Sequence, residues 1–228
     1  MLNMYTQEEL KVLVAKEAVA RFVKSGMTVG LGTGSTAKYV VIELGRKLKN
    51  GELNNVMGVP TSNATRDLAI ENEVPLFDGL PDKLDLTIDG ADRINLETGD
   101  CLKGWGGAHY VEKRIAKLGS RMVVIVDSSK LCTSFAGEKI PLEVMPEQLN
   151  FLREELELKG LEHSVREVLS DSKNYLVDVV LPANFELTEF HAEMMKLPGV
   201  LDTGVFSGIV TDVVVSDGSG EVGSYSIL

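Results

Sequence analysis

The stretch that decides the fold is MTVGLGTGSTAKYVVIELGRKLK, residues 27–49. It opens with a short apolar run (27–32), continues through the small-residue loop GTGST (32–36), and ends in a segment that predicts a helix through Lys49. The same alternation continues to residue 130, with strands expected at 55–59, 74–77, 84–88 and 122–126 and helices at 61–72 and 108–118. Strands that are apolar on both faces and alternate with helices predict an α/β fold: an open, mostly parallel, Rossmann-like sheet flanked by helices.

An amphipathic helix is expected before this stretch, over residues 7–24. Its apolar face would carry Leu10, Leu13, Val14 and Ala18. Thr6, followed three positions later by Glu9, has the pattern of a capping box that begins this helix.

The pattern changes after Lys130. PLEVM (141–145), a charged helix at 146–159, HSVREVL (163–169), NYLVDVVL (174–181), a helix at 186–196 and VLDTGVF (200–206) follow in β-α-β-β-α-β order. That order is the split βαβ signature of a small, ferredoxin-like α+β domain. The apolar tail IVTDVVV (209–215) is expected to rejoin the first sheet. We therefore expect an α/β domain of residues 1–130 plus 207–228, which holds the candidate site, and a small α+β domain of residues 131–206.

Composition narrows the class of protein. The chain has 228 residues, 44% of them hydrophobic, and a net charge of −11. This charge argues against a duplex nucleic-acid binder, which needs a basic face. The apolar runs, such as MVVIV (122–126), are too short to span a membrane. The N-terminal segment lacks the pattern of a signal peptide. Cys101 and Cys132 lack metal-ligand spacing, and two reduced thiols in a cytoplasmic protein are expected.

The loop GTGSTA (32–37) matches the loose dinucleotide pattern G-x-G-x-x-A, but the next predicted strand ends in VPTSN, without the acid that binds a ribose hydroxyl. We favour a loop whose amides and hydroxyls surround a phosphate or sugar at a helix N-terminus. The alternative is a tight strand–helix turn capped by Ser or Thr.

Asp89 and Asp92, in LTIDGADRIN (86–95), follow an apolar strand with only Gly90 and Ala91 between them. Two carboxylates this close are expected to repel and to split their pKa values, and such a pair can move protons between oxygens. The alternative is an Asx-turn with a helix cap. No histidine or further acid lies nearby at ligand spacing, so no metal site is expected.

The turn LKGWGGAHYVEK (102–113) places Lys103 nine positions before Glu112. A lysine at the end of a loop can stabilise a developing oxyanion, and a glutamate in an apolar pocket can have its pKa raised into the range of a base. The alternative is a solvent-facing charged pair. Lys130, in DSSK (127–130), has two readings of equal weight, a phosphate ligand and a turn lysine in water. His109 is expected at a helix N-terminus beside the site, and His163 and His191 as structural or surface groups.

Taken in order, GLGTGSTA, TIDGADRIN, LKGWGGAHYVEK and VDSSK resemble ribose-5-phosphate isomerase of the A type. The later PLEV and the segment at 198–206 resemble the C-terminal half of the same family. The resemblance implies a metal-independent and cofactor-free isomerase of the pentose phosphate pathway. Such an enzyme interconverts ribose 5-phosphate and ribulose 5-phosphate through an enediol. A small-molecule sugar phosphate would be its partner, and a cytoplasmic homodimer is expected, with a tetramer as the alternative.

The resemblance also implies roles by position. Glu112 would be the general base, and Lys103 would stabilise the enediolate oxygen. Asp89, helped by Asp92, would move protons on the sugar oxygens and assist ring opening. The substrate would be bound by these last three residues and by the loop and turn residues Thr33, Gly34, Ser35, Thr36, Gly90, Ala91, Gly104, Trp105, Gly106 and Lys130. An N-terminal lysine contributes in some members, and sequence alone does not decide between Lys11 and Lys16.

This chain departs from the family inside the same turn, where Trp105 replaces a glycine, His109 and Tyr110 replace small or aliphatic residues, and Val111 replaces a common arginine. We expect Trp105 to cap or narrow the pocket, and a positive φ there would strain the backbone. Other readings of the chain are a non-catalytic sugar-phosphate sensor domain, an amino-sugar-phosphate deaminase and a CoA transferase.

Overall fold

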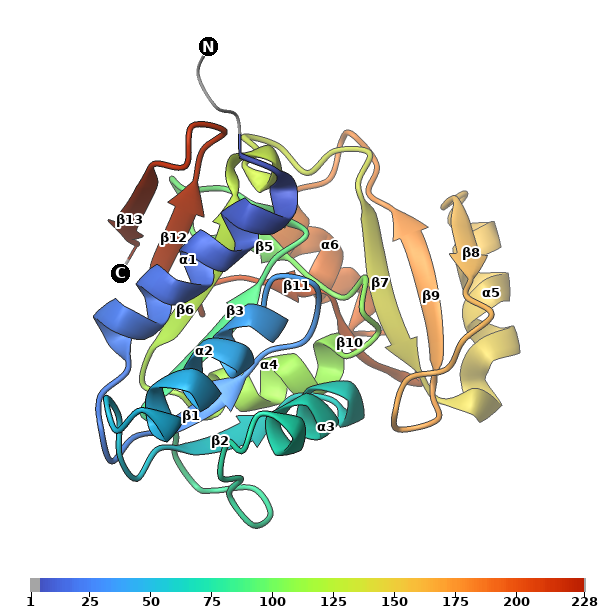
Figure 1. Cartoon of the computed structure of the whole chain (residues 1–228). Coiled ribbons are helices and arrows are strands. Elements are labelled where there is room, and N and C mark those ends of the chain that lie inside the picture. The colour runs from blue at the N-terminus through green and yellow to red at the C-terminus, as the bar shows by residue number, and fades with distance from the viewer. Residues whose placement is uncertain (1–4, 228) are drawn as a thin grey trace.

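The computed structural model describes residues 5–227, so residues 1–4 and 228, which the predicted α/β domain includes, lie outside it. Its centre is a six-stranded sheet in the order β13-β12-β6-β3-β1-β2 (Figure 1). The strands are β1 (Thr28–Leu31), β2 (Met57–Pro60), β3 (Leu86–Gly90), β6 (Met122–Asp127), β12 (Asp212–Ser216) and β13 (Val222–Ser226). All neighbouring pairs are parallel except β12–β13. The prediction of an open, mostly parallel α/β sheet is confirmed, and so is the return of the tail to it.

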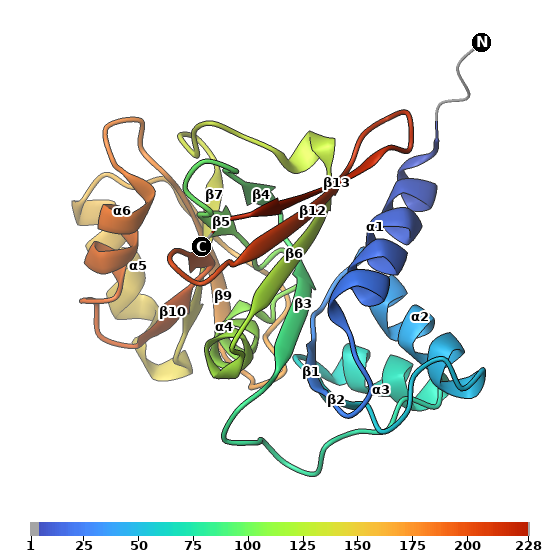
Figure 2. The ribbon, with the colours of Figure 1, turned by 90° about the vertical axis from the view of Figure 1, so that its left-hand side faces the viewer.

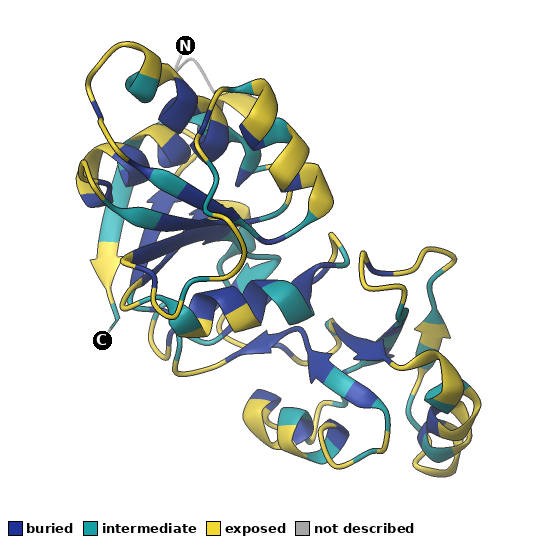
Figure 3. Ribbon diagram, turned by 90° about the horizontal axis from the view of Figure 1, so that it is seen from below, coloured by how far each residue is buried: buried dark blue, intermediate teal, exposed yellow. Residues whose placement is uncertain are grey.

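Helices cover both faces of this sheet. One face packs against α1 (Gln7–Phe22), α2 (Lys38–Lys49) and α3 (Asn63–Glu71), whose apolar side chains share one core with β1 and β3. The other face packs against α4 (His109–Leu118), which lies between the large sheet and the second sheet (Figure 3). Within the part of the chain that the structure describes, we find no helix with the length and apolarity needed to cross a membrane.

The second sheet is antiparallel, in the order β10-β7-β9-β8. Its strands are β7 (Lys139–Val144), β8 (His163–Val165), β9 (Tyr175–Val180) and β10 (Val200–Thr203). Figure 2 shows α5 (Leu149–Leu158) and α6 (Leu187–Met194) on its outer side, and their apolar residues form a separate core with it. The chain order β7-α5-β8-β9-α6-β10 is the predicted split βαβ order. The boundaries near residues 130 and 206 stay a prediction.

Some predicted elements differ from the structure. Residues 74–77 make only one bridge to β2, between Leu76 and Gly58, because Pro75 has no N–H with which to extend a ladder. The charged helix at 146–159 is a short 3₁₀ turn (Pro146–Gln148) followed by α5. The hairpin strand β13 was not predicted, since its half-exposed residues lack the apolar run of the inner strands.

The expected strand at 200–206 is divided at Gly204 into β10 and β11 (Val205–Phe206). With β4 (Arg93–Ile94) and β5 (Cys101–Leu102), β11 forms a three-stranded sheet whose two-residue strands are too short to show a pattern. A Cβ at Gly204 would lie 2.0 Å from the carbonyl oxygen of Lys103, so only glycine allows this close approach. The break in the strand thus brings the second sheet against the turn that carries Lys103.

The N-terminal helix begins as predicted. Thr6 accepts a hydrogen bond from the Glu9 amide, and the Glu9 carboxylate accepts one from the Thr6 amide. The buried face of α1 is rotated relative to the expected one, because Lys11 is buried and Leu13 is only partly buried. This rotation turns Lys11 towards the edge of the sheet where the candidate site lies.

We predict that Thr6→Ala lowers the free energy of unfolding by about 1 kcal/mol, because the first turn of α1 loses a capping hydrogen bond. Chemical denaturation at equilibrium measures this change. Thr188→Ala, at an exposed position of α6, is the matched control and should change stability by less than about 0.5 kcal/mol. Equal stability of Thr6→Ala and wild type would contradict the capping role.

Candidate active site

The candidate site lies at the carboxyl ends of β1, β3 and β6, three adjacent parallel strands. Loops that follow parallel strands meet at this edge, which is where open α/β sheets bind ligands. A cavity of about 300 Å³ lies there. Of the predicted site residues, all but Asp89 line it, and Gln7 and Lys11 line it as well: Thr33, Gly34, Ser35, Thr36, Gly90, Ala91, Asp92, Lys103, Gly104, Trp105, Gly106, Glu112 and Lys130.

The Lys103 ammonium is the centre of the site. It lies 3.0 Å from Oδ2 of Asp89 and 3.2 Å from Oε2 of Glu112, and it donates a 2.6 Å hydrogen bond to the Gly90 carbonyl. All three charged side chains are buried, each about 3% exposed or less. A solvent-facing Lys103–Glu112 pair, the alternative considered above, is therefore wrong.

Burial raises the pKa of Glu112 to about 8, an effect that the Lys103 ammonium opposes and the Asp89 carboxylate reinforces. Burial also raises the pKa of Asp89, again against the effect of Lys103. Burial alone would lower the pKa of Lys103, but Asp89 and Glu112 hold it above its ordinary value. The ammonium thus stays charged near neutral pH, while Glu112 can both accept and release a proton.

Asp89 and Asp92 do not form the carboxylate pair that their spacing suggested. Asp89 lies beneath the cavity, where its Oδ1 accepts a 2.7 Å hydrogen bond from the Gly90 amide. Asp92 lines the cavity, and its Oδ2 accepts a 3.1 Å hydrogen bond from the Trp105 amide. Burial raises the pKa of Asp92, and Lys103 opposes this effect. Each carboxylate therefore has its own partner, and only Asp92 faces the cavity directly.

The loop after β1 lies close to β3, since a Cβ at Gly32 would lie 2.1 Å from the Asp89 carboxyl carbon. The Thr33 hydroxyl lies within hydrogen-bonding distance of three hydroxyls at the start of α3, at 2.7 Å from Thr61, 2.8 Å from Ser62 and 3.1 Å from Thr65. Thr33 therefore anchors the loop to α3.

Ser35 and Thr36 are the residues of this loop that remain open to a ligand. Within residues 5–227 their backbone amides and side-chain hydroxyls make no hydrogen bond, and they lie just before α2. Unpaired amides before a helix form a binding site for an anion. The groups of GTGST that an anion could bind therefore lie in the second half of this loop.

Two further lysines line the cavity. Lys130 follows β6 in a short 3₁₀ turn, and its charge acts on Asp92. Lys11 reaches the cavity from α1, paired at 2.7 Å with the more exposed Glu8. Lys16 is exposed. Of these two lysines, Lys11 is therefore the one that lines the cavity.

Trp105 sits in the glycine-rich turn without backbone strain. The positive φ angles of this turn belong to Gly104 (115°) and Gly107 (72°), and Trp105 is not among the non-glycine residues with positive φ. The residue is 70% exposed and lines the cavity. The turn tolerates tryptophan at this position because the special backbone conformations fall on the neighbouring glycines.

His109 begins α4, as predicted, but it is fully buried. Burial lowers its pKa to about 3, and the Lys113 charge adds to this effect. The imidazole is therefore neutral near neutral pH, and it packs against Gly104 of the turn. His163 and His191 lie on β8 and α6, where the Nδ1 atom of each makes a local contact, to Leu161 and Thr203 respectively.

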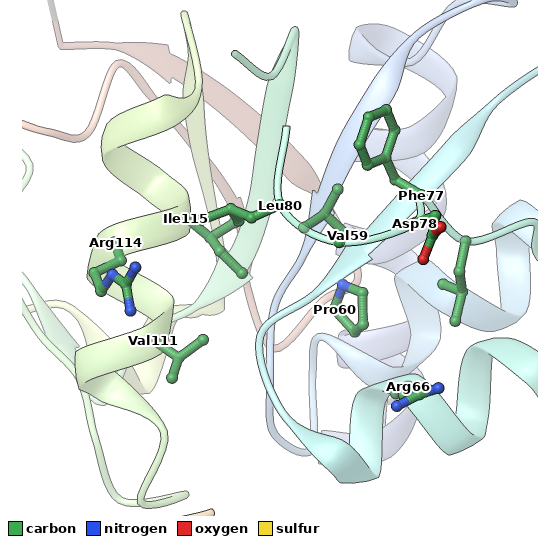
Figure 4. A pocket seen from close by; sticks show the side chains of 11 residues that line it. Val59, Pro60, Arg66, Phe77, Asp78, Leu80, Val111, Arg114 and Ile115 are labelled. Carbon is green, nitrogen blue, oxygen red and sulfur yellow. The ribbon is translucent and has the colours of Figure 1, made fainter. Parts of the chain in front are cut away.

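A larger cavity of about 510 Å³ lies on the other side of α4, between this helix, α3 and β2 (Figure 4). Val111, Ile115 and Val59 form apolar parts of its wall, and the exposed Arg66 and Arg114 lie at opposite sides. It contains none of the predicted site residues. We place the chemistry in the smaller cavity, because the buried lysine–carboxylate cluster and the open loop amides meet there.

Comparison with solved structures finds close matches along almost the whole chain. Ribose 5-phosphate isomerase from Plasmodium falciparum superposes with a TM-score of 0.90 at 35% identity, covering 96% of this chain and 98% of that one. A D-ribose-5-phosphate isomerase in complex with phospho-erythronic acid superposes with a TM-score of 0.91 at 33% identity, covering 97% of this chain and all of the other.

Sequence comparison agrees. Ribose-5-phosphate isomerase A of Deinococcus radiodurans is 42% identical over 218 residues, which cover 92% of this chain and 94% of that protein. A probable ribose-5-phosphate isomerase of Arabidopsis thaliana is 36% identical and covers 94% of this chain. The sequence profile of ribose 5-phosphate isomerase A (phosphoriboisomerase A) matches residues 57–220. The chain therefore belongs to the ribose 5-phosphate isomerase A family.

Proposed function

We propose that this protein interconverts D-ribose 5-phosphate and D-ribulose 5-phosphate. The observation that carries the proposal is the buried contact of Lys103 with Asp89 and Glu112 beside a cavity with open loop amides. A base of raised pKa can move the proton of an aldose–ketose isomerisation, a fixed ammonium can stabilise the enediolate oxygen, and an anion-binding loop can hold the sugar phosphate. Family membership supports the same reaction.

The substrate phosphate binds at the start of α2. The free amides of Ser35 and Thr36 point their partial positive charge to this place, and the helix dipole adds to it. Lys11 and Lys130, which line the same cavity, supply full positive charges. This binding is remote from the reacting carbons, so it positions the sugar for the chemical step.

Glu112 carries the proton. Its carboxylate removes the proton from C2 of the open-chain aldose, the C2 electron pair forms the C1–C2 double bond, and the C1 carbonyl oxygen becomes an enediolate oxygen. Asp92 takes the proton from O2 and delivers one to O1, and return of the abstracted proton from Glu112 to C1 then gives the ketose. The Lys103 ammonium stabilises the oxygen on which negative charge develops, because it is already oriented and shielded from water.

The two aspartates have different roles in this mechanism. Asp92 faces the cavity and exchanges protons with sugar oxygens, including the step that opens the ring. Asp89 lies beneath Lys103 and fixes the position and charge of the ammonium. The solved relative with phospho-erythronic acid supports a site for phosphorylated sugar acids, since that ligand combines a phosphate and a carboxylate on a sugar chain.

Replacing Glu112 by Gln removes the base but keeps its shape. We expect kcat to fall by about 10²- to 10⁴-fold, with substrate affinity changed by less than about threefold. A ketose assay and calorimetric titration measure the two quantities. Glu154→Gln, at an exposed position of α5, is the matched control and should keep wild-type kcat. Near-normal turnover of Glu112→Gln would remove Glu112 as the base.

The raised pKa of Glu112 predicts a pH dependence. The base acts when deprotonated, so kcat/KM should rise with pH, approaching tenfold per unit well below the pKa, and level off above about pH 8. The ionised form is also the one that burial disfavours, so Glu112 contributes stability that is present below pH 4.5 and lost as pH rises through about 8. A kcat/KM profile that is flat from pH 6 to pH 9 would contradict this assignment.

The N-terminal lysine can be tested with a pair of variants. Lys11→Met should raise KM for ribose 5-phosphate by about tenfold or more, because a charged hydrogen-bond donor to the phosphate is lost. Lys16→Met removes the same charge from the exposed side of the same helix and should leave KM unchanged. Steady-state kinetics of both variants decide, and equal KM values would refute the Lys11 assignment.

Two further expectations concern the location and the assembly of the protein. A cytoplasmic location and a homodimer, with a tetramer as the alternative, follow from the resemblance to the family. Light scattering coupled to gel filtration measures the assembly directly.

A further inference from the structure

The glycine-rich turn of the site is held by a side chain from the second sheet. Arg166, which follows β8, donates from Nη1 to the carbonyl of Gly104 at 2.9 Å and to that of Trp105 at 3.2 Å. These carbonyls belong to the two residues directly after Lys103. A guanidinium binds two neighbouring acceptors in a fixed geometry, which a single flexible ammonium does not reproduce.

Arg166 is itself held in place. Asp178 on β9 accepts two parallel hydrogen bonds from it, at 2.9 Å from Nε and 2.7 Å from Nη2. Both side chains are largely buried, 17% and 14% exposed. A bidentate, partly buried pair of this kind restricts both side chains, so the third nitrogen, Nη1, points at the turn in one orientation.

The same hairpin also contacts the start of α3. In the loop between β8 and β9, Asp171 Oδ2 accepts a 2.7 Å hydrogen bond from the Asn63 amide at the start of α3. The neighbouring Ser62 hydroxyl is one of those that hold Thr33. The β8–β9 hairpin therefore contacts the Lys103 turn and the support of the anion-binding loop at once.

The turn that Arg166 holds makes two contacts that matter for chemistry. The Trp105 amide donates a hydrogen bond to Asp92, and Lys103, the first residue of the turn, forms an ion pair with Asp89. Small displacements of such groups are costly, since an error of about 1 Å in a reacting geometry can lower a rate by about 10²-fold. An element that fixes the backbone of this turn therefore acts on turnover without touching the substrate.

We infer that Arg166 is a positioning residue for the isomerase reaction: oriented by Asp178, it holds the backbone of Gly104 and Trp105 so that Lys103 and Asp92 meet the substrate in register. The inference rests on the proposed function for its kinetic consequence. Its structural part, the fixed turn, is independent of the reaction.

The chain contains a direct reporter of this turn, because Trp105 is its only tryptophan. Intrinsic fluorescence therefore reads the turn without a label. In Arg166→Ala we expect lower fluorescence anisotropy of Trp105 and a kcat about 10- to 100-fold lower, with a smaller change in KM. Arg153→Ala, at an exposed position of α5, removes the same charge from the same part of the chain and should change neither quantity.

Arg166→Lys and Asp178→Asn keep the inference testable if Arg166→Ala fails to fold. The lysine variant retains the charge beside Asp178 but not the fork, and it should lose anisotropy and kcat in parallel. Asp178→Asn leaves the guanidinium in place but less well oriented, so it should show a smaller loss of both. Guanidinium added at millimolar concentration should restore part of the activity of Arg166→Ala. It should restore no activity to Arg166→Lys.

The outcomes separate the two proposals. Absence of isomerase activity in the wild type would refute the proposed function. The fluorescence anisotropy of the variants would then still test whether Arg166 fixes the turn. Wild-type anisotropy and kcat in folded Arg166→Lys would overturn the positioning role. So would a loss of kcat that only follows the unfolded fraction, because that result indicates a residue needed for stability alone.

Discussion

The site depends on one buried contact, the Lys103 ammonium against the carboxylates of Asp89 and Glu112. Charges removed from water are unstable alone, so each member of this group requires the others. The same burial raises the pKa of Glu112 to about 8 and gives the carboxyl its use as a base. Burial of these charges therefore lowers the stability of the fold and, at the same place, makes Glu112 suitable as a base.

The contact requires three separate elements to meet. Asp89 is the last residue but one of β3, Glu112 lies on α4, and Lys103 follows β5. Glycine at 32 and 204 lets backbone approach Asp89 and the Lys103 carbonyl more closely than any side chain would allow. The second sheet then adds Arg166, whose hydrogen bonds hold the turn after Lys103. The small domain thus supports the site from outside, although none of its residues lines the cavity.

Most of the fold and much of the site could be predicted from local patterns. The inner strands are continuous apolar runs, and Lys103 and Glu112 are held in register by one turn and one helix. Residues that reach the site from afar gave no such signal. Arg166 and Asp178 form a pair across a hairpin, and Lys11 depends on how α1 rotates against the sheet. The hairpin strand β13 was missed because its residues are half-exposed, and β4 and β5 because two residues are too few to show a period.

The sequence by itself determined the alternation of strands and helices, the ferredoxin-like order of the second part, and the identity of the loops that meet at the sheet edge, because these follow from periodicity, chain order and short spacings. The tertiary structure alone decided which charges are buried, and hence which carboxyl has a raised pKa. It also gave Asp89 and Asp92 different hydrogen-bond partners, brought Lys11 and not Lys16 to the cavity, and placed Arg166 against the Trp105 turn. Burial and contact between distant segments are properties of packing, and no local spacing encodes them.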